Sequence, residues 1–258
     1  MPRRRLYRQE RHDLILQTLL DTGYVSVAEL GELLGVSAVT VRSDLDALES
    51  AGQLLRTHGG AVPIHLGDGL LSFSVRQRTR AEAKARIGAA AAALVADGEA
   101  IVLDASTTAW HLAHHLLSRR DLTVLTTGLY VALELLRSPG INVLMPGGSV
   151  WREAAAIVGS RDLDILPRGN FQRVFLGGRG LSLEQGLTDP NQEEVALKRQ
   201  LMQAVREVNL IIDSSKLGKV SFASCAQIDE IHRVITDRDA PADFVAALRA
   251  QGVQVVLA

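Results

Sequence analysis

The spacing of apolar residues divides the chain into two parts. Before residue 63, leucines, isoleucines and valines recur every three or four positions, which is typical of amphipathic helices. After residue 80, short apolar runs alternate with helical stretches, and this alternation predicts βαβ units and a mostly parallel sheet. We therefore expect an N-terminal domain over residues 1–62, a linker over residues 63–80 and a C-terminal α/β domain over residues 81–258.

The N-terminal part predicts three helices and a small β-hairpin in about 60 residues, a combination typical of one compact module. Ser26 and Ser37 are N-cap candidates for the second and third helices, and glycines stand where each helix should end. The helices are expected over residues 10–21, 27–34 and 37–50, and the hairpin over residues 54–62.

The junction between the second and third helices has the features of a helix-turn-helix. Gly35 permits a tight turn, and Val41 and Leu45 fall on one face of the third helix, so the opposite polar face is free. In such motifs the first turns of that helix enter the major groove, while basic residues elsewhere contact phosphates. The alternative is a helical module that binds another protein. The residues expected to contact DNA are Arg3, Arg4, Arg5, Ser37, Thr40, Arg42, Ser43, Arg56 and His58.

In the C-terminal part, polar and glycine-rich loops follow several predicted strands. Asp104–Thr108 comes after the first strand and opens a helix, and hydroxyls with free backbone N–H groups at such a position favour an anion. In an open α/β sheet the loops at the carboxyl ends of the strands converge on the ligand. The alternative is that Ser106 and Thr107 are only N-caps. Further loops of this kind occur at residues 126–128, 146–148, 177–180 and 213–216.

The remaining elements of this part are expected as alternating strands and helices. Strands are predicted over residues 100–103, 122–125, 141–145, 173–176, 210–212, 234–235 and 253–257. Helices are predicted over residues 81–96, 108–117, 130–137, 160–166, 191–208 and 242–250.

Composition narrows the class of protein. The chain has 258 residues and a net charge of −1, and a single cysteine, Cys225, which allows no internal disulfide. The longest apolar stretch, Gly88–Ala96, is too short to span a bilayer, and the arginines at the start lack the apolar region of a signal peptide, so we expect a cytoplasmic protein. His111, His114 and His115 lack a further ligand nearby, so we expect no metal, and the sequence indicates no cofactor.

At this point the sequence resembles a known family. The segments Val25–Leu30, Gly35–Ser37, Thr40–Leu45 and Arg56–Ala61 are similar to the signature of the DeoR family of bacterial transcription regulators, and the resemblance extends over nearly the whole chain. One departure affects the third helix, where the family usually has two adjacent arginines and this chain has Arg42 followed by Ser43.

The resemblance implies a winged helix-turn-helix followed by an α/β sensor domain that is similar to ribose-5-phosphate isomerase, with a sugar phosphate as effector. By this resemblance Asp104 would accept hydrogen bonds from sugar hydroxyls, and the loops at residues 106–108 and 127–128 would bind the phosphate. The implied effector-binding residues, together with Gly147 from the converging loops, are Asp104, Ser106, Thr107, Thr108, Thr127, Gly128, Gly147, Glu193, Lys198 and Lys216. The turns that carry the isomerase's base and lysine are not repeated in Gly177–Gly180 and Leu183–Gly186, which indicates that the chain is not an enzyme.

These observations predict a DNA-binding repressor of sugar or polyol catabolic genes, released from a duplex operator by a phosphorylated sugar. Because two recognition helices must meet half-sites about 34 Å apart, we expect a homo-oligomer, with dimer and tetramer both open. Repression and activation are not distinguished by the sequence, nor are the effector and the target genes. An isomerase with a DNA-binding appendage is the alternative enzyme hypothesis, and formation of a ketose from ribose 5-phosphate would reveal it.

Overall fold

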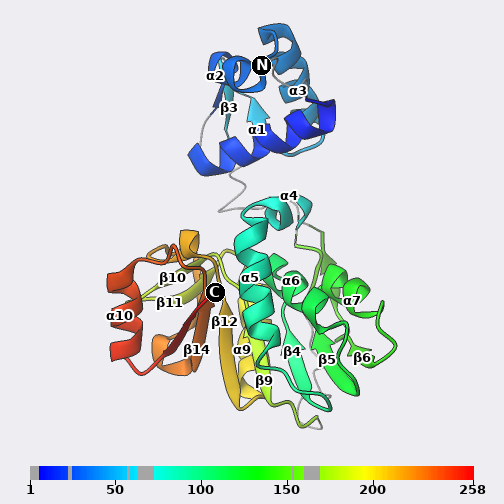
Figure 1. Ribbon diagram of the computed structural model, residues 1–258, viewed down its shortest axis with the longest axis vertical. Coiled ribbons are helices and arrows are strands. Elements are labelled where there is room, and N and C mark those ends of the chain that lie inside the picture. The colour runs from blue at the N-terminus through cyan, green and yellow to red at the C-terminus, as the bar shows by residue number, and fades with distance from the viewer. Residues whose placement is uncertain (1–5, 23–24, 57–58, 63–72, 153, 160–168) are drawn as a thin grey trace. The chain divides into compact units, whose positions relative to one another are not determined.

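The protein folds as two compact units, Met1–Thr79 and Arg80–Ala258, in a computed structural model (Figure 1). The structure describes all residues except 1–5, 23–24, 57–58, 63–72, 153 and 160–168. Part of the predicted linker lies outside the described residues. The end of this linker is described: Phe73–Arg78 forms a short helix, α4, and Phe73 is buried.

Three helices form the core of the first unit: α1 (Arg8–Thr22), α2 (Val27–Leu34) and α3 (Ala38–Ser50). The Ser26 hydroxyl accepts a hydrogen bond from the backbone N–H of Glu29, whose carboxylate accepts one in return from Ser26 N, so α2 begins with a capping box. Gly35 ends α2 with φ of 66°, a left-handed conformation that glycine adopts without a steric penalty. Val41 and Leu45, the apolar positions predicted to face inward, are buried, and so is Leu48 one turn further along α3.

A three-stranded antiparallel sheet completes this unit, in the order β1–β3–β2. Its strands are β1 (Val25–Ser26), β2 (Leu55–Arg56) and β3 (Gly60–Val62). At Gly60 a Cβ atom would lie 1.9 Å from the carbonyl oxygen of Val25, so only glycine lets β3 pair so closely with β1. The helix-turn-helix therefore carries a wing, as the sequence predicted.

The second unit contains a seven-stranded sheet, all of whose neighbouring strands are parallel, in the order β15–β14–β12–β9–β4–β5–β6. The chain builds β4, β5 and β6 in one direction from the centre and then returns to add β9, β12, β14 and β15 on the other side. The strands are β4 (Ala100–Leu103), β5 (Leu122–Thr126), β6 (Ile141–Leu144), β9 (Arg173–Leu176), β12 (Glu207–Ile211), β14 (Arg233–Thr236) and β15 (Gln254–Leu257).

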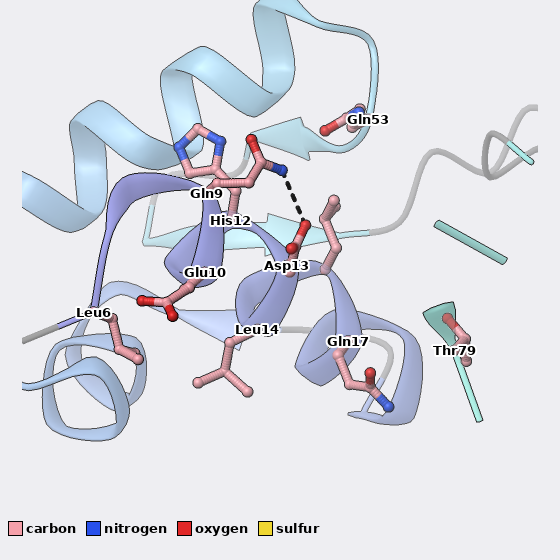
Figure 2. A pocket seen from close by; sticks show the side chains of 10 residues that line it. Leu6, Gln9, Glu10, His12, Asp13, Leu14, Gln17, Gln53 and Thr79 are labelled. Carbon is pink, nitrogen blue, oxygen red and sulfur yellow. Dashed lines mark hydrogen bonds between the residues drawn. The ribbon is translucent and has the colours of Figure 1, made fainter. Parts of the chain in front are cut away.

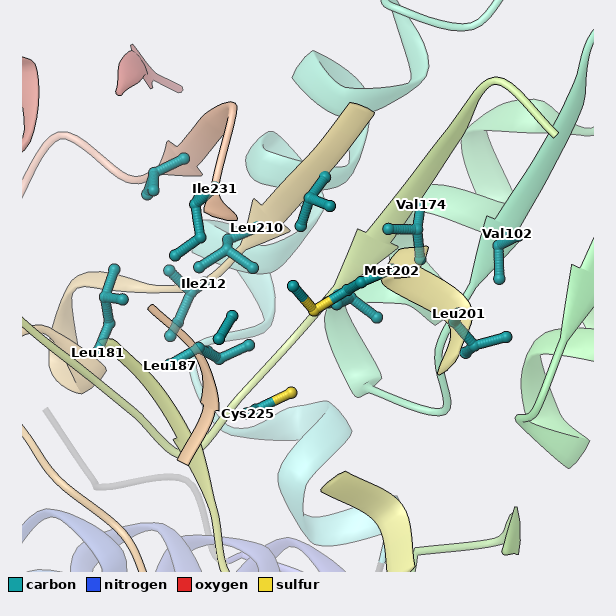
Figure 3. Close-up of a cluster of buried hydrophobic side chains, with 14 of the residues drawn as sticks. Val102, Val174, Leu181, Leu187, Leu201, Met202, Leu210, Ile212, Cys225 and Ile231 are labelled. Carbon is teal, nitrogen blue, oxygen red and sulfur yellow. The ribbon is translucent and has the colours of Figure 1, made fainter. Parts of the chain in front are cut away.

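Helices cover both faces of this sheet (Figure 1). Alternate strand residues face opposite ways: Val102 and Val174 pack with Leu201 in one apolar cluster (Figure 3), while Ile101 and Phe175 belong to a second cluster with the helices of the opposite face. The helices are α5 (Ala81–Ala92), α6 (Thr107–Leu116), α7 (Leu129–Leu135), α9 (Gln192–Gln203) and α10 (Ala242–Ala250), with 3₁₀ turns at Ser214–Lys216 and Ile228–Glu230.

Several elements differ from the sequence prediction. The helix expected over residues 191–208 ends at Gln203, and Glu207–Ile211 forms strand β12 beside β9, because the apolar spacing of the helix continues into the strand. Two small antiparallel sheets were not predicted: β7 (Ser149–Trp151) with β8 (Ala156–Val158), and β10 (Gly180–Ser182) with β11 (Gly186–Asp189) and β13 (Ala223–Ala226). The helix expected over residues 160–166 lies outside the described residues.

Candidate functional site

The start of α3 presents polar side chains to the exterior. Arg42 and Ser43 are exposed, and so is the N-cap residue Ser37, whose hydroxyl accepts a hydrogen bond from Thr40 N at 3.3 Å. The two hydroxyls of Ser37 and Thr40 lie 3.0 Å apart. No acidic residue occupies the first turn of α3, so the partial positive charge at this end of the helix is uncompensated and favours a phosphate.

The wing residue Arg56 is held within its own unit. Its Nε atom lies 3.1 Å from a carboxylate oxygen of Asp46 on α3, and its Nη1 donates to the carbonyl oxygen of Gly60. Its backbone N–H donates to Glu49. These contacts tie the wing to the end of α3 and leave the Arg56 side chain about one-fifth exposed. Four other predicted DNA contacts, Arg3, Arg4, Arg5 and His58, lie outside the described residues.

Asp44, on the inner face of α3, anchors this helix to α1 and was not predicted to do so. Its carboxylate is 2 % exposed and accepts two hydrogen bonds from Arg11, from Nε at 2.7 Å and from Nη2 at 2.9 Å. His12 Nε2 lies 3.2 Å from the same carboxylate. Burial would raise the pKa of Asp44, but the hydrogen bonds and charge of Arg11 hold it below its ordinary value. Arg11 therefore fixes the recognition helix and is not part of a free basic arm.

In the second unit the predicted effector loops meet where the strand order reverses, between β4 and β9. Asp104 follows β4 and bridges the two strands: its Oδ1 accepts from Ser106 N at 2.9 Å and its Oδ2 from Gly177 N, just after β9, at 2.7 Å. At two positions where these loops approach one another there is no room for a side chain. A Cβ atom on Gly177 would lie 2.5 Å from Ser106 Cβ, and one on Gly128 would lie 2.8 Å from Ala105 Cα.

Lys198 on α9 reaches the same place and is almost fully buried. Its ammonium donates to Asp189 Oδ2 at 2.6 Å and to the carbonyl oxygen of Gly177 at 3.0 Å. Two more carboxylates are near, Asp104 at 3.2 Å and Glu194 at 3.3 Å. Asp104 and Lys198, both predicted as effector-binding residues, are therefore in direct contact. Asp189 and Glu194 were not among the predicted residues, although the four-residue spacing of Glu194 and Lys198 on a helix is a usable signal.

This Lys198 cluster, formed with Asp104, Asp189 and Glu194, has unusual electrostatics. Burial would lower the pKa of Lys198, but the surrounding carboxylates raise it well above its ordinary value, so the ammonium stays charged. Burial raises the pKa of Asp189 to about 6, opposed by Lys198 and reinforced by Glu194. Three carboxylates thus share one cation.

The other predicted effector residues lie on α6, at the start of α9 and on the segments that follow β5, β6 and β12. Ser106 caps α6, since its hydroxyl accepts from Ala109 N, and the side chains of Thr107 and Thr108 are buried in the first turn. The amide of Thr127 donates to the Leu103 carbonyl oxygen, and that of Gly128 donates to Thr126 Oγ1, so both are already engaged within the fold. Glu193 and Gly147 are exposed, and Lys216 lies in the turn after β12.

A pocket of about 450 Å³ lies elsewhere, along α1 of the first unit (Figure 2). Side chains of Gln9 and Asp13, joined by a hydrogen bond, are among those that line it, and none of the predicted effector residues does so. Among the described residues, no group of three or more histidine, cysteine or acidic side chains is arranged to hold a metal ion. The described helices also include none whose length and apolarity would suit a bilayer span.

Comparison with known proteins places both units in one family. Residues 79–238 match the sequence pattern described as the DeoR C terminal sensor domain, and residues 11–66 match the DeoR-like helix-turn-helix domain. This chain belongs to the DeoR family. Its membership confirms the resemblance and the predicted two-part fold, an N-terminal helix-turn-helix with a C-terminal α/β domain.

Full-length relatives of this DeoR-family protein are transcription regulators. It is 36 % identical over 228 residues to the HTH-type transcriptional regulator GolR of Listeria innocua, covering 88 % of this chain and 90 % of the relative. It is 30 % identical over 254 residues to the glycerol-3-phosphate regulon repressor of Escherichia coli K12, covering 96 % and 98 %. The prediction of a DNA-binding regulator and not an enzyme is therefore confirmed. A ribose 5-phosphate isomerase from Plasmodium falciparum aligns with a TM-score of 0.39 and 14 % identity, over 52 % of each chain.

Proposed function

We propose that this regulator represses genes of sugar or polyol catabolism and leaves its operator when a sugar phosphate binds at the carboxyl ends of β4 and β9. The observation that carries the proposal is the bridge that Asp104 makes between the two strands, in contact with Lys198. A ligand held at this point contacts loops from both halves of the sheet, so its binding energy can change their relative positions.

The chemistry of the loops suits a polyol with a phosphate at one end. The Asp104 carboxylate has about four lone-pair positions, of which three are taken by Ser106 N, Gly177 N and Lys198, so one is left for a sugar hydroxyl. The N–H groups of Thr107 and Thr108 stand in the first turn of α6, where a helix supplies no acceptor, and they are suited to a phosphate. The E. coli relative is named for the glycerol-3-phosphate regulon, which agrees with a phosphorylated effector.

A thermal-shift comparison of matched ligands tests the effector. Glycerol 3-phosphate, ribose 5-phosphate and fructose 1-phosphate are each compared with the unphosphorylated compound, using the full chain. A ligand at 100 times its Kd stabilises the folded protein by about 2.7 kcal/mol, so the phosphorylated member of one pair should raise the melting temperature and its partner should not. Equal shifts within every pair would overturn the assignment of the phosphate site.

The DNA-contact residues follow from the exposed start of α3. We infer that Arg42 reads a base edge. Neighbouring phosphates or bases are contacted by Ser37, Thr40 and Ser43. Arg56 supports the wing against the DNA backbone. Two copies must act together to place two recognition helices in successive major grooves about 34 Å apart, so the working form is at least a dimer. As a DNA-binding regulator it would work in the cytoplasm.

Substituting Arg42→Ala tests the base contact. The operator is obtained by selecting duplexes from a random pool with the wild-type protein. If Arg42 reads a base, the substitution should reduce discrimination between the operator and random DNA by about 1–3 kcal/mol, measured by fluorescence anisotropy at fixed salt. Arg86→Ala, an exposed arginine on α5, serves as the control. Equal weakening on both duplexes would show that Arg42 contacts only phosphate.

A further inference from the structure

Arg80, the first residue of the second unit, has an unusual backbone conformation. Its φ of 53° and ψ of 38° lie in the left-handed region, which an L-residue other than glycine rarely adopts. Such a conformation persists only where the surrounding structure holds it, and it is often found in switch segments. The residue is also the point at which the chain leaves this unit toward the DNA-binding unit.

Three aspartates hold the Arg80 side chain. Its Nη2 lies 3.2 Å from Asp239 and 3.7 Å from Asp237, and its Nε lies 3.6 Å from Asp213. The carboxylates of Asp213 and Asp237 are 5 % and 0 % exposed, whereas Arg80 is 32 % exposed. Buried carboxylates need a compensating cation, so these contacts, which we call the Arg80 clasp, fix the guanidinium and with it the backbone of residue 80.

The clasp is built on the loop that carries Lys216, one of the predicted effector residues. Arg80 Nη2 donates to Ser214 Oγ at 3.0 Å, and the amide of Ser214 donates to Asp237 Oδ2 at 2.7 Å. Ser214 therefore bonds to both Arg80 and Asp237. It lies two residues before Lys216, in the same 3₁₀ turn. A ligand that displaces Lys216 also displaces an atom to which Arg80 is bonded.

A second connection runs through the helix that begins directly after Arg80. α5 packs against α6 so closely that a Cβ atom on Gly88 would lie 2.8 Å from the backbone of His111 and Leu112. α6 begins at the loop that contains Ser106 and Thr107. The residue before α5 therefore contacts the predicted effector loop at residues 213–216. The body of α5 packs against α6, the helix that follows the predicted effector loop at residues 104–108.

We propose that Arg80 is a positioning residue that couples the effector site to the DNA-binding unit. Without effector the clasp holds residue 80 in its left-handed conformation, and effector binding at residues 213–216 weakens the clasp so that the backbone relaxes and redirects the chain before it. The clasp holds residue 80 in the left-handed conformation, whereas the backbone of an arginine disfavours that conformation. Because the two effects oppose each other, a small movement of Ser214 is sufficient to shift the equilibrium between the two backbone conformations. This inference rests on the proposed function and adds to it that the bound ligand reaches the turn after β12, the strand that pairs with β9.

The test uses the full chain and four variants. Arg80→Ala removes the clasp, Arg80→Gly removes the clasp and also makes the left-handed backbone favourable, and Arg80→Lys keeps the charge without the planar fork. Arg86→Ala on the exposed face of α5 is the matched control. The measured quantity is the ratio of affinities for the selected operator with and without the sugar phosphate that gives the largest thermal shift with the wild type. Both affinities are measured at a temperature below the unfolding transition of each variant, so that the ratio refers to folded protein.

Couplings between two sites in one protein are typically about 5–150-fold, and we expect both Arg80→Ala and Arg80→Gly to reduce the wild-type ratio to about 2-fold or less. Both variants should still bind the sugar phosphate, seen as a rise in melting temperature, and Arg80→Lys should give an intermediate ratio. A full wild-type ratio in Arg80→Ala and Arg80→Gly would overturn the coupling role alone. A wild-type protein that responds to none of the sugar phosphates would instead overturn the proposed function, and this inference with it.

Discussion

Each unit of the molecule contains a buried charge cluster, and the two clusters have opposite compositions. In the DNA-binding unit one carboxylate, Asp44, is bonded by Arg11 and His12 from a neighbouring helix. In the sensor unit one ammonium, Lys198, is shared by three carboxylates that come from a strand end, a small sheet and its own helix. The first cluster has enough cations to satisfy its carboxylate, whereas the second has more negative charge than positive.

The difference indicates different roles. The Asp44 carboxylate has its hydrogen-bond partners within its own unit, so it fixes the arrangement of α3 relative to α1. A cluster with surplus negative charge is held less favourably, and its state depends on protons or ligands that reach it.

The largest effect is expected from Lys198→Met, which removes the cation from two buried carboxylates, Asp104 and Asp189, and from the partly buried Glu194. Breaking a buried ion pair on one side costs about 3–5 kcal/mol of unfolding free energy. Chemical denaturation followed by circular dichroism measures this loss, with the exposed Lys219→Met as control, expected to change stability by less than about 0.5 kcal/mol. Similar stability for the two variants would mean that Lys198 does not neutralise the cluster.

A smaller effect is expected from Asp44→Ala, which leaves Arg11 without its partner. Because Arg11 is 14 % exposed and regains some hydration, the loss should be about 2–3 kcal/mol, the range for hydrogen bonds to charged groups. The control is Asp46→Ala, an exposed carboxylate on the same helix, for which less than about 1 kcal/mol is expected. If the units unfold in separate transitions, Asp44→Ala should lower only that of the first unit and Lys198→Met only that of the second. Loss of both transitions in either variant would contradict the independence of the two clusters.

The smallest effect concerns pH and the Asp189 carboxyl. Its pKa of about 6 in the folded protein lies above the ordinary value of 3.8, so the folded state binds this proton more tightly. Its contribution to stability is therefore present at low pH and is lost as the pH rises through 6. Wild type should gain stability relative to Asp189→Asn when the pH falls from 7 to 5, measured by denaturant titration at each pH. Asp229→Asn, at an exposed carboxyl, should show no such change, and a constant difference for Asp189→Asn would contradict the raised pKa.

The DNA-binding unit was predicted well because its structure is determined locally. The bounds of α2 and the start of α3 follow from Ser26, Gly35 and Ser37, which act within a few residues of their position. The large sheet was also predicted, since each buried strand is a short apolar run. The strands β10, β11 and β13 were not, because they are only three or four residues long, carry no regular alternation, and β11 pairs with β13 across 34–39 positions of the chain.

The candidate site was predicted in part for a related reason. Asp104 and Lys198 were placed together from the family resemblance, and the structure gives their contact. The position of Asp189 depends on the register of β11, and the partners of Arg11 and Arg80 lie 33 and more than 130 residues away along the chain, so no local pattern reveals them. The role of Arg11 in holding α3 through Asp44 was not predicted, because it depends on how α1 and α3 pack together.

The close meeting of α5 and α6 at Gly88 bears on how this protein tolerates mutation. A single methyl group there would push two backbones apart, and no rotation of a side chain could relieve the overlap. Gly98 and Gly218 face open space and need only a left-handed backbone, which asparagine adopts more readily than most residues. Under random mutagenesis with selection for regulation, position 88 should accept no replacement, whereas positions 98 and 218 should yield asparagine among the survivors.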